Sequence, residues 1–276
     1  MEMVKAKLTL AAALLLILSS CNPGPQWRKH YIDGRFTGVT AVAGENYEAS
    51  LGSVDSVYHA PNGRIFSCGS TPAVAKLLID AQPQMQYLKE VLAHSPEEMR
   101  TGRIETALGD WSVDALAKGV EARLNRHVDV AILNIGGIRV SMPKGDVLLD
   151  DIVSMFPFKN YLSYVTVKGS DIRYMFDFMA SRRRPEAVSG ARFVINGRQA
   201  EDITVGGEPL DDDKLYGVGT IDFLLDGGDS LYVARNAKEL LISDCLMREW
   251  MVDYVRNLGE KGIEVNAKTD GRVTIK

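Results

Sequence analysis

The chain has 276 residues, of which 46% are apolar and 25% are charged, and its formal net charge is −4. This length suits one large domain, or one domain with a smaller lobe, and the composition excludes a disordered chain. The acidic balance argues against DNA or RNA as a partner, because binding a polyanion depends on a basic surface.

The first residues predict export from the cytoplasm. Lys5 and Lys7 precede an apolar run over residues 8–18, which is short for a membrane span of about 20 residues. The run ends in Leu-Ser-Ser-Cys at residues 18–21, which resembles a bacterial lipobox. We therefore expect residues 1–20 to be a lipoprotein signal peptide and Cys21 to be lipidated. The alternative is an ordinary secretory signal in which Cys21 is incidental.

This interpretation places the protein in the bacterial cell envelope, anchored to a membrane by lipid on the periplasmic or surface side. Residues 21–30 contain two prolines and a glycine and are expected to be a short tether. The cysteines beyond Cys21 are Cys68 and Cys245. Outside the cytoplasm they suit either a disulfide or two free buried thiols.

Residues 31–80 predict a strand-rich segment packed on the main domain. Near its end, Thr71 and Pro72 are typical of a helix start, and the helix is expected to reach residue 81. Pro83 is expected to interrupt it, with a second helix through residues 87–92. Residues 95–98 are expected to form another helical turn.

Residues 81–276 are expected to form the main domain. Helical spacing of apolar residues indicates helices at 110–124, from 169, and at 243–258. Short apolar or alternating runs predict strands at 128–133, 161–168, 191–195, 203–205 and 215–219, and a strand with a helical turn at 147–153. This order predicts an α+β domain in which helices flank mixed β-sheets.

Three separate segments combine glycines with aromatic or polar residues. They are residues 134–139 (Asn-Ile-Gly-Gly-Ile-Arg), 156–160 (Phe-Pro-Phe-Lys-Asn) and 222–229 (Asp-Phe-Leu-Leu-Asp-Gly-Gly-Asp). Glycines let a ligand approach the backbone, phenylalanines can clamp a flat ring, and arginine suits a phosphate or carboxylate. Each segment alone has an ordinary structural interpretation, a turn or a core residue. Their joint occurrence predicts a nucleotide-binding site.

In order and spacing, these segments resemble the C-terminal substrate-recognition domain of the 5'-nucleotidase/UDP-sugar hydrolase family, over residues 81–276. Residues 103–110 also resemble a block of that family. The resemblance implies that Phe158 and Phe223 sandwich the base, that Arg139 contacts the phosphate, and that Asp229 accepts hydrogen bonds from the ribose hydroxyls. The implied substrate-binding set is Asn134, Gly136, Gly137, Arg139, Phe158, Asn160, Phe223, Gly228 and Asp229.

The chain also departs from the family pattern. Asp110 stands where an asparagine or a basic residue is usual, and Ser230 replaces a glycine. The four histidines (His30, His59, His94 and His127) are isolated and do not form the metal-binding blocks of the family's phosphatase domain. We therefore expect no catalytic residue and no cofactor or metal in this chain. Divalent metals are expected only in a partner phosphatase.

Three hypotheses follow. The first is one half of a split 5'-nucleotidase, a nucleotide-recognising chain that acts with a separate metallophosphatase chain. The second is a non-catalytic lipoprotein that binds nucleosides, which Asp110 and the small number of arginines favour. The third is an autonomous hydrolase that uses Asp222, Asp226 and Asp229.

Overall fold

The computed structural model describes residues 51–276 and divides the chain into two compact units, Met1–Ile79 and Asp80–Lys276. The predicted signal peptide (1–20), the lipidated Cys21, the tether (21–30) and residues 31–50 of the strand-rich segment lie outside the described residues. No helix within the described part combines the length and apolar character needed to cross a membrane. Cys68 and Cys245 are both free thiols.

The described part of the first unit contains three short antiparallel strands and most of one helix. Tyr58 pairs with Val54 on one side and with Phe66 on the other. The elements are β1 Ser53–Val54, β2 Tyr58–His59, β3 Ile65–Phe66 and α3 Thr71–Met85. The predicted break at Pro83 is wrong, because α3 continues through this proline. Proline's fixed φ is helical, so Pro83 lacks a hydrogen-bond donor without ending the helix.

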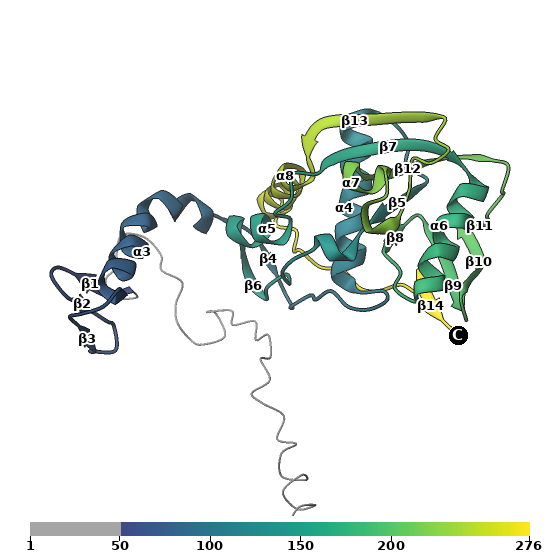
Figure 1. Ribbon diagram of the computed structural model, residues 1–276. Coiled ribbons are helices and arrows are strands. Elements are labelled where there is room, and N and C mark those ends of the chain that lie inside the picture. Colours follow the sequence, from purple (N-terminus) through teal and green to yellow (C-terminus); the bar gives the residue numbers. More distant parts are fainter. Residues whose placement is uncertain (1–50) are drawn as a thin grey trace, which may run out of the picture. The chain divides into compact units, whose positions relative to one another are not determined.

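A five-stranded sheet forms the centre of the second unit (Figure 1). Strands β12 and β5 run parallel, and every other neighbouring pair is antiparallel. In spatial order the strands are β13 Glu239–Leu246, β7 Tyr161–Lys168, β12 Leu215–Ile221, β5 Val130–Leu133 and β8 Ala187–Ser189. Strand β5 is buried at all four positions, as its continuous apolar run predicts.

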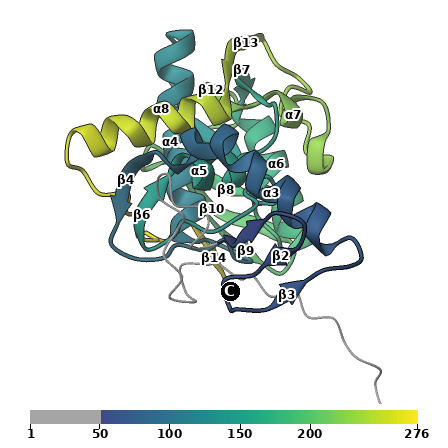
Figure 2. The same cartoon turned by 90° about the vertical axis from the view of Figure 1, so that its left-hand side faces the viewer.

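Helix α4 (Ala107–Leu124) packs along this sheet and buries much of its length. Its start is fixed by Thr106, whose side-chain oxygen accepts a hydrogen bond from the backbone N–H of Gly109. Helix α8 (Met247–Glu260) lies beside α5 (Leu149–Met155) and strand β4 (Val91–Ser95) (Figure 2). These helices close one side of the apolar core.

A second sheet of four strands packs with α6 (Gly169–Arg182). The rings of Phe176 on α6 and Phe193 on β9 are stacked, with centroids 4.5 Å apart, at the centre of this contact. In spatial order the strands are β11 Glu208–Pro209, β10 Gln199–Val205, β9 Ala191–Asn196 and β14 Val273–Ile275.

The predicted α+β architecture is confirmed, but three further local predictions are wrong besides the break at Pro83. The helix expected at 87–92 is a 3₁₀ turn, Gln86–Lys89, followed by strand β4 (Val91–Ser95), which pairs with β6 (Gly145–Leu148). The helical turn expected at 95–98 is absent, since residue 95 ends β4 and residues 96–98 form no helix. The last predicted helix begins at Met247, and residues 243–246 belong to β13.

Candidate functional site

The three motif segments meet at one edge of the five-stranded sheet. Strands β5 and β12 are parallel and paired, with Val130 opposite Val218, so their carboxyl ends lie at the same edge. Strand β7 is antiparallel to β12 and starts at this edge, with Leu162 opposite Ile221. Residues 134–139 follow β5, residues 222–229 follow β12, and residues 156–160 precede β7. The topology therefore brings together segments that are far apart in sequence.

Asn134 links the first and third segments. Its side-chain Nδ2 donates a hydrogen bond of 2.7 Å to Oδ2 of Asp229, which is 95 residues away. The side chain is buried, and its Oδ1 has no hydrogen-bond partner. A Cβ atom at Gly137 would lie 3.0 Å from that Oδ1, so a side chain there would crowd the amide. Gly137 thus gives Asn134 the space to reach Asp229.

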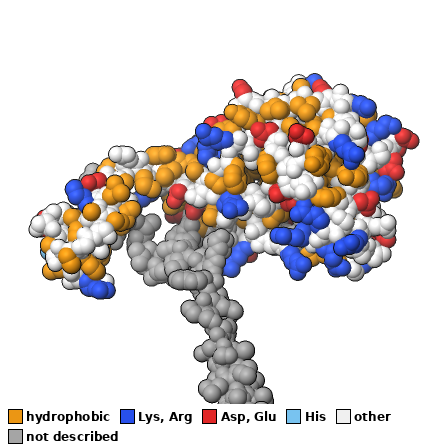
Figure 3. All heavy atoms as spheres, in the orientation of Figure 1, with side chains coloured by type: hydrophobic (Ala, Val, Ile, Leu, Met, Phe, Trp, Pro, Cys, Tyr) orange, Lys and Arg blue, Asp and Glu red, His pale blue; other side chains and the backbone are white. Residues whose placement is uncertain are grey.

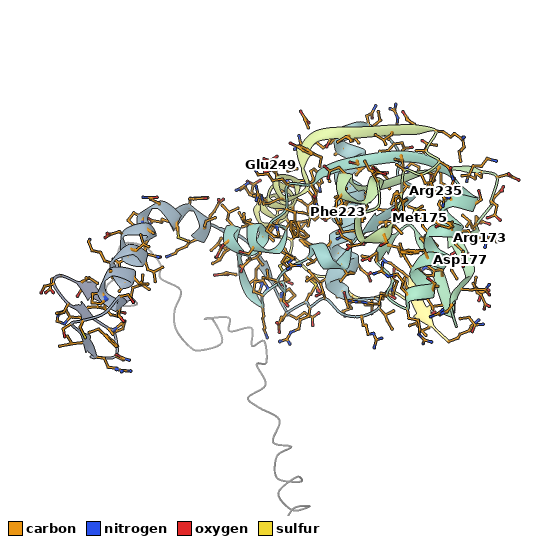
Figure 4. The ribbon with its side chains drawn as sticks, in the orientation of Figure 1. Arg173, Met175, Asp177, Phe223, Arg235 and Glu249 are labelled. Carbon is orange, nitrogen blue, oxygen red and sulfur yellow. The ribbon has the colours of Figure 1, made fainter. Side chains whose placement is uncertain are left out.

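The two phenylalanines are the most exposed apolar parts of the site. Phe158 is 48% exposed and Phe223 is 46% exposed, and among the described residues neither ring stacks on another aromatic ring. Phe223 lies on the short helix α7 (Asp222–Leu225) and is labelled in Figure 4. Apolar side chains also reach the surface of the unit among charged ones (Figure 3). Half-exposed rings at a sheet edge can receive a flat ligand.

Gly228 is necessary for the position of Phe223. A Cβ atom at residue 228 would lie 2.1 Å from the carbonyl oxygen of Phe223 and 2.6 Å from its ring. No side chain fits at that distance. Asp222 fixes the start of α7 through its Oδ1, which accepts the backbone N–H groups of Tyr161 and Phe223 at 3.0 and 2.9 Å. This carboxylate holds β7 and α7 together, which is a structural role.

Asp229 has a left-handed backbone conformation, with φ of 51°, and the following Ser230 has φ of 64°. Non-glycine residues rarely adopt such angles, and the strain persists only where surrounding contacts enforce it. One such contact comes from α6, where Nη1 of Arg182 donates a 2.7 Å hydrogen bond to the carbonyl oxygen of Asp229. Arg182 therefore helps to hold the aspartate at the site.

Arg139 is exposed beside Phe158. Its guanidinium carbon lies 5.8 Å from the centroid of the Phe158 ring, and its Nη1 donates to the carbonyl oxygen of Gly136 at 3.1 Å. These contacts leave other guanidinium donors available for a phosphate or carboxylate. Asn160 and Phe158 line a small pocket together with Asn134 and Gly137. The remaining lining is apolar: Leu133, Phe156, Ile221 and Met247.

Glu186 belongs to the site, although no sequence motif pointed to it. Its Oε2 accepts the backbone N–H of Ile135 at 2.8 Å and so holds the glycine loop after β5. Burial raises the pKa of Glu186, and the nearby Asp229 adds to this, whereas Arg182 and Arg184 oppose it. These two arginines therefore contribute positive charge near the site.

The described residues offer no histidine-based metal centre. His94 lies 3.4 Å from Glu264 and His127 lies 3.0 Å from Glu121, each as an exposed pair. Within residues 51–276, the one group of three side chains placed to hold a metal ion is Glu105, Asp110 and Asp270. Asp222, Asp226 and Asp229, which the hydrolase hypothesis requires, do not form such a group in the described part of the chain.

Residues 89–235 match the family model described as the 5'-nucleotidase C-terminal domain. The chain belongs to this family. It is 30% identical to the protein UshA of Yersinia enterocolitica over 105 residues, which cover 37% of this chain and 19% of that protein. It is 28% identical to the trifunctional nucleotide phosphoesterase protein YfkN of Bacillus subtilis over 204 residues, which cover 68% of this chain and 13% of the relative.

Solved structures share the fold. A 5'-nucleotidase precursor from Thermus thermophilus superimposes with a TM-score of 0.66 at 24% identity, over 78% of this chain and 45% of that chain. The NAD nucleotidase of Haemophilus influenzae gives a TM-score of 0.57 at 17% identity, over 92% of this chain and 47% of that chain. The chain thus spans less than half the length of each of these proteins. The family model and the relatives link this family to nucleotide metabolism.

Proposed function

We propose that the C-terminal unit binds a nucleotide or nucleoside at this sheet edge. The base lies between Phe158 and Phe223, and the phosphate contacts Arg139. Oδ2 of Asp229 accepts the hydrogen bond from Asn134, and in this proposal Oδ1 accepts hydrogen bonds from the ribose hydroxyls. The main support is the meeting of the three motif segments at one edge, joined by the Asn134–Asp229 hydrogen bond.

Catalysis in this proposal comes from a separate metallophosphatase chain, and the two chains together act as a 5'-nucleotidase in nucleotide catabolism. Paired metals would activate water and neutralise the departing phosphate there. The partnership is tested by phosphate release from AMP by the phosphatase chain, measured with and without this protein. Equal rates in both cases contradict the partnership.

The second candidate is a nucleoside-binding envelope lipoprotein without a catalytic partner. On sequence, Asp110 favours it, because a carboxylate close to a phosphate is unfavourable. That argument is weaker in the structure, since Asp110 is 3% exposed and faces Arg272. Arg182 and Arg184 add positive charge near Asp229 and Glu186, which favours a charged ligand.

Calorimetric titration of the full chain with adenosine and with AMP separates these two candidates. We expect saturable binding of both ligands, at least about tenfold weaker in Phe158→Ala, because stacking on one aromatic ring contributes about 1–3 kcal/mol. Arg139→Ala is expected to weaken the binding of AMP but not the binding of adenosine. The matched control is Tyr174→Ala on α6, which removes a 51% exposed ring away from the motif segments. Equal loss in the control and Phe158 variants contradicts the site.

The envelope location also remains a proposal. It predicts that Cys21 is the lipid-modified first residue of the mature protein. Mass spectrometry of the membrane fraction measures this directly, and an unmodified mature N-terminus contradicts it.

A further inference from the structure

Three consecutive arginines, Arg182, Arg183 and Arg184, lie at the C-terminal end of α6, and all three are exposed. We call them the arginine patch. None of them forms an ion pair with a carboxylate of residues 51–276, whereas Arg173, earlier on the same helix, pairs with Asp212 at 2.9 Å. The chain as a whole has a net charge of −4, so a positive patch without acidic partners is unusual for its surface.

The arginine patch begins at the candidate nucleotide site. Nη1 of Arg182 donates a 2.7 Å hydrogen bond to the carbonyl oxygen of Asp229, the residue proposed to bind the ribose hydroxyls. The guanidinium carbon of Arg182 also lies 5.3 Å from the centroid of the Phe178 ring, a contact that helps to fix the side chain. A guanidinium has five N–H donors, so those that do not bond to Asp229 remain available to a ligand.

Arg184 lies near the same point. Burial raises the pKa of Glu186, and the hydrogen bond from Ile135 and the charges of Arg182 and Arg184 oppose that rise, so both guanidinium groups lie near this carboxylate. Glu186 does not pair with them, because its Oε2 accepts the backbone N–H of Ile135 and neither arginine forms an ion pair within the described part of the chain. Three arginines thus lie beside two carboxylates, those of Glu186 and Asp229, and the excess charge is positive.

The end of a helix does not by itself account for the arginine patch. A cation in the last turn interacts favourably with the helix dipole, and this effect falls off within that turn. Arg182 is the basic residue of the last turn of α6, but its side chain bonds to Asp229. Arg183, with φ of 49°, is the residue at which the helix ends, and Arg184 lies beyond it.

Arg139, which is proposed to contact the 5'-phosphate, approaches the ribose position from a different loop. Its Nη1 donates to the carbonyl oxygen of Gly136 at 3.1 Å. A Cβ atom at Gly136 would lie 3.9 Å from Oδ2 of Asp229, so the loop that carries Arg139 adjoins the residue that Arg182 contacts. Two separate positive groups therefore adjoin the proposed ribose position, and a single 5'-phosphate uses only one of them.

We propose that the site takes a nucleotide with a second phosphate on its ribose, at the 2' or the 3' hydroxyl, and that Arg182 and Arg184 bind this phosphate. The inference rests on the proposed function, which places the ribose at Asp229. The hydroxyl that is not phosphorylated remains free to donate a hydrogen bond to Asp229. Arginine suits this role because its planar guanidinium matches the geometry of phosphate oxygens.

Calorimetric titration of the full chain with AMP, adenosine 3',5'-bisphosphate and adenosine 2',5'-bisphosphate tests the proposal. We expect at least one bisphosphate to bind about tenfold more tightly than AMP, because hydrogen bonds between charged groups contribute at least this factor. The preference should decrease as the salt concentration rises, since salt screens exposed charges.

The double variant Arg182→Gln/Arg184→Gln is expected to lose the preference for the bisphosphate. Because Arg182 also holds the backbone of Asp229, Arg184→Gln alone provides a second measurement, and it should reduce the ratio of the two affinities about two- to fivefold, as expected for one exposed charge. The matched control is Arg198→Gln, which removes an exposed arginine in the turn between β9 and β10 and should keep the preference.

Two results overturn the proposal. The first is equal binding of AMP and both bisphosphates by the wild type, and the second is a full preference for the bisphosphate in the double variant. In either case AMP still binds, so the proposed function stands. Absence of binding by all three ligands overturns the proposed function and this inference with it.

Discussion

The sheet edge and the charged cluster around Arg272, which contains Asp110, Asp114 and Asp270, differ in how their side chains are stabilised. At the edge, Phe158 and Phe223 remain about half exposed and Arg139 is at the surface. In the cluster, Arg272 is 13% exposed and bonded to two carboxylates. Exposed apolar rings gain stabilisation only when a ligand covers them, whereas buried charges must be paired in the folded chain itself. The edge is therefore suited to binding and the cluster to stability.

The largest expected effect tests the cluster. Arg272→Ala removes the cation of Asp114, whereas Asp270 keeps its ion pair with Arg192. Arg272 is buried but Asp114 is partly exposed, so losing these charge-assisted hydrogen bonds should cost about 1.5–3 kcal/mol. We expect a matching loss in the free energy of unfolding, measured by urea denaturation. The control is Arg173→Ala, which breaks the exposed pair with Asp212 and should cost less than about 1 kcal/mol. Equal losses would show that the cluster is no more important than a surface ion pair.

The next effect tests the edge. Asp229→Asn keeps a residue that tolerates φ of 51° but removes the carboxylate that we propose binds the ribose hydroxyls. We expect adenosine affinity to fall about tenfold, with little change in unfolding free energy, because a hydrogen bond to a charged group is worth about 1.5–3 kcal/mol. Calorimetry with adenosine and 2'-deoxyadenosine measures this. Wild type should bind adenosine more tightly than 2'-deoxyadenosine, and the variant should bind the two equally. If the variant keeps the preference for adenosine, the proposed role of Asp229 is contradicted.

A smaller effect tests backbone strain at the edge. Ser230 has φ of 64°, which glycine adopts freely and a β-branched residue rarely adopts. We expect Ser230→Gly to change stability by less than about 1 kcal/mol, and Ser230→Val to destabilise by about 1–2 kcal/mol. Thermal unfolding of both variants provides the measurement. If the valine variant is as stable as the glycine variant, the left-handed conformation is not enforced.

The smallest effect concerns pH and Glu186. Burial raises its pKa in the folded state, so the folded chain binds more protons than the unfolded chain. Its contribution to stability is thus fully present below the unfolded pKa near 4.3 and is lost as pH rises through the folded pKa. Glu186→Gln should remove this pH dependence while keeping an acceptor for Ile135. The free energy of unfolding of wild type and Glu186→Gln, measured from pH 4 to pH 8, tests this prediction. An unchanged slope of that free energy against pH in the variant contradicts the assignment of the pH dependence to Glu186.

The main features of the edge could be predicted from sequence because they are local. The apolar run of residues 128–133 indicated β5, and the glycine segments after β5 and β12 mark the carboxyl ends of paired strands. Residues 110–124 likewise formed a helix where their periodicity predicted one. Local propensity and tertiary packing agree in these elements.

The contributions of Glu186 and Arg272 could not be predicted, because no local pattern reveals their partners. Arg272 pairs with Asp114 from 158 residues away, and Glu186 accepts from Ile135 across 51 residues. The helix predicted where β4 forms is wrong, because the spacing of the apolar residues there fits both the helical and the strand period. Pairing with β6 decides in favour of the strand. Sheet partners override a short apolar pattern.

The Asn134–Asp229 hydrogen bond also has a consequence for folding. Its two residues are separated by 95 positions, and the parallel pairing of β5 with β12 spans a similar stretch. Closing so long a loop has an entropic cost that must be met before the contact forms, so such pairings are slow to form. A chain emerging from the ribosome has no binding site until β12 is complete. Ligand therefore cannot guide the early stages of folding and can only stabilise the finished sheet.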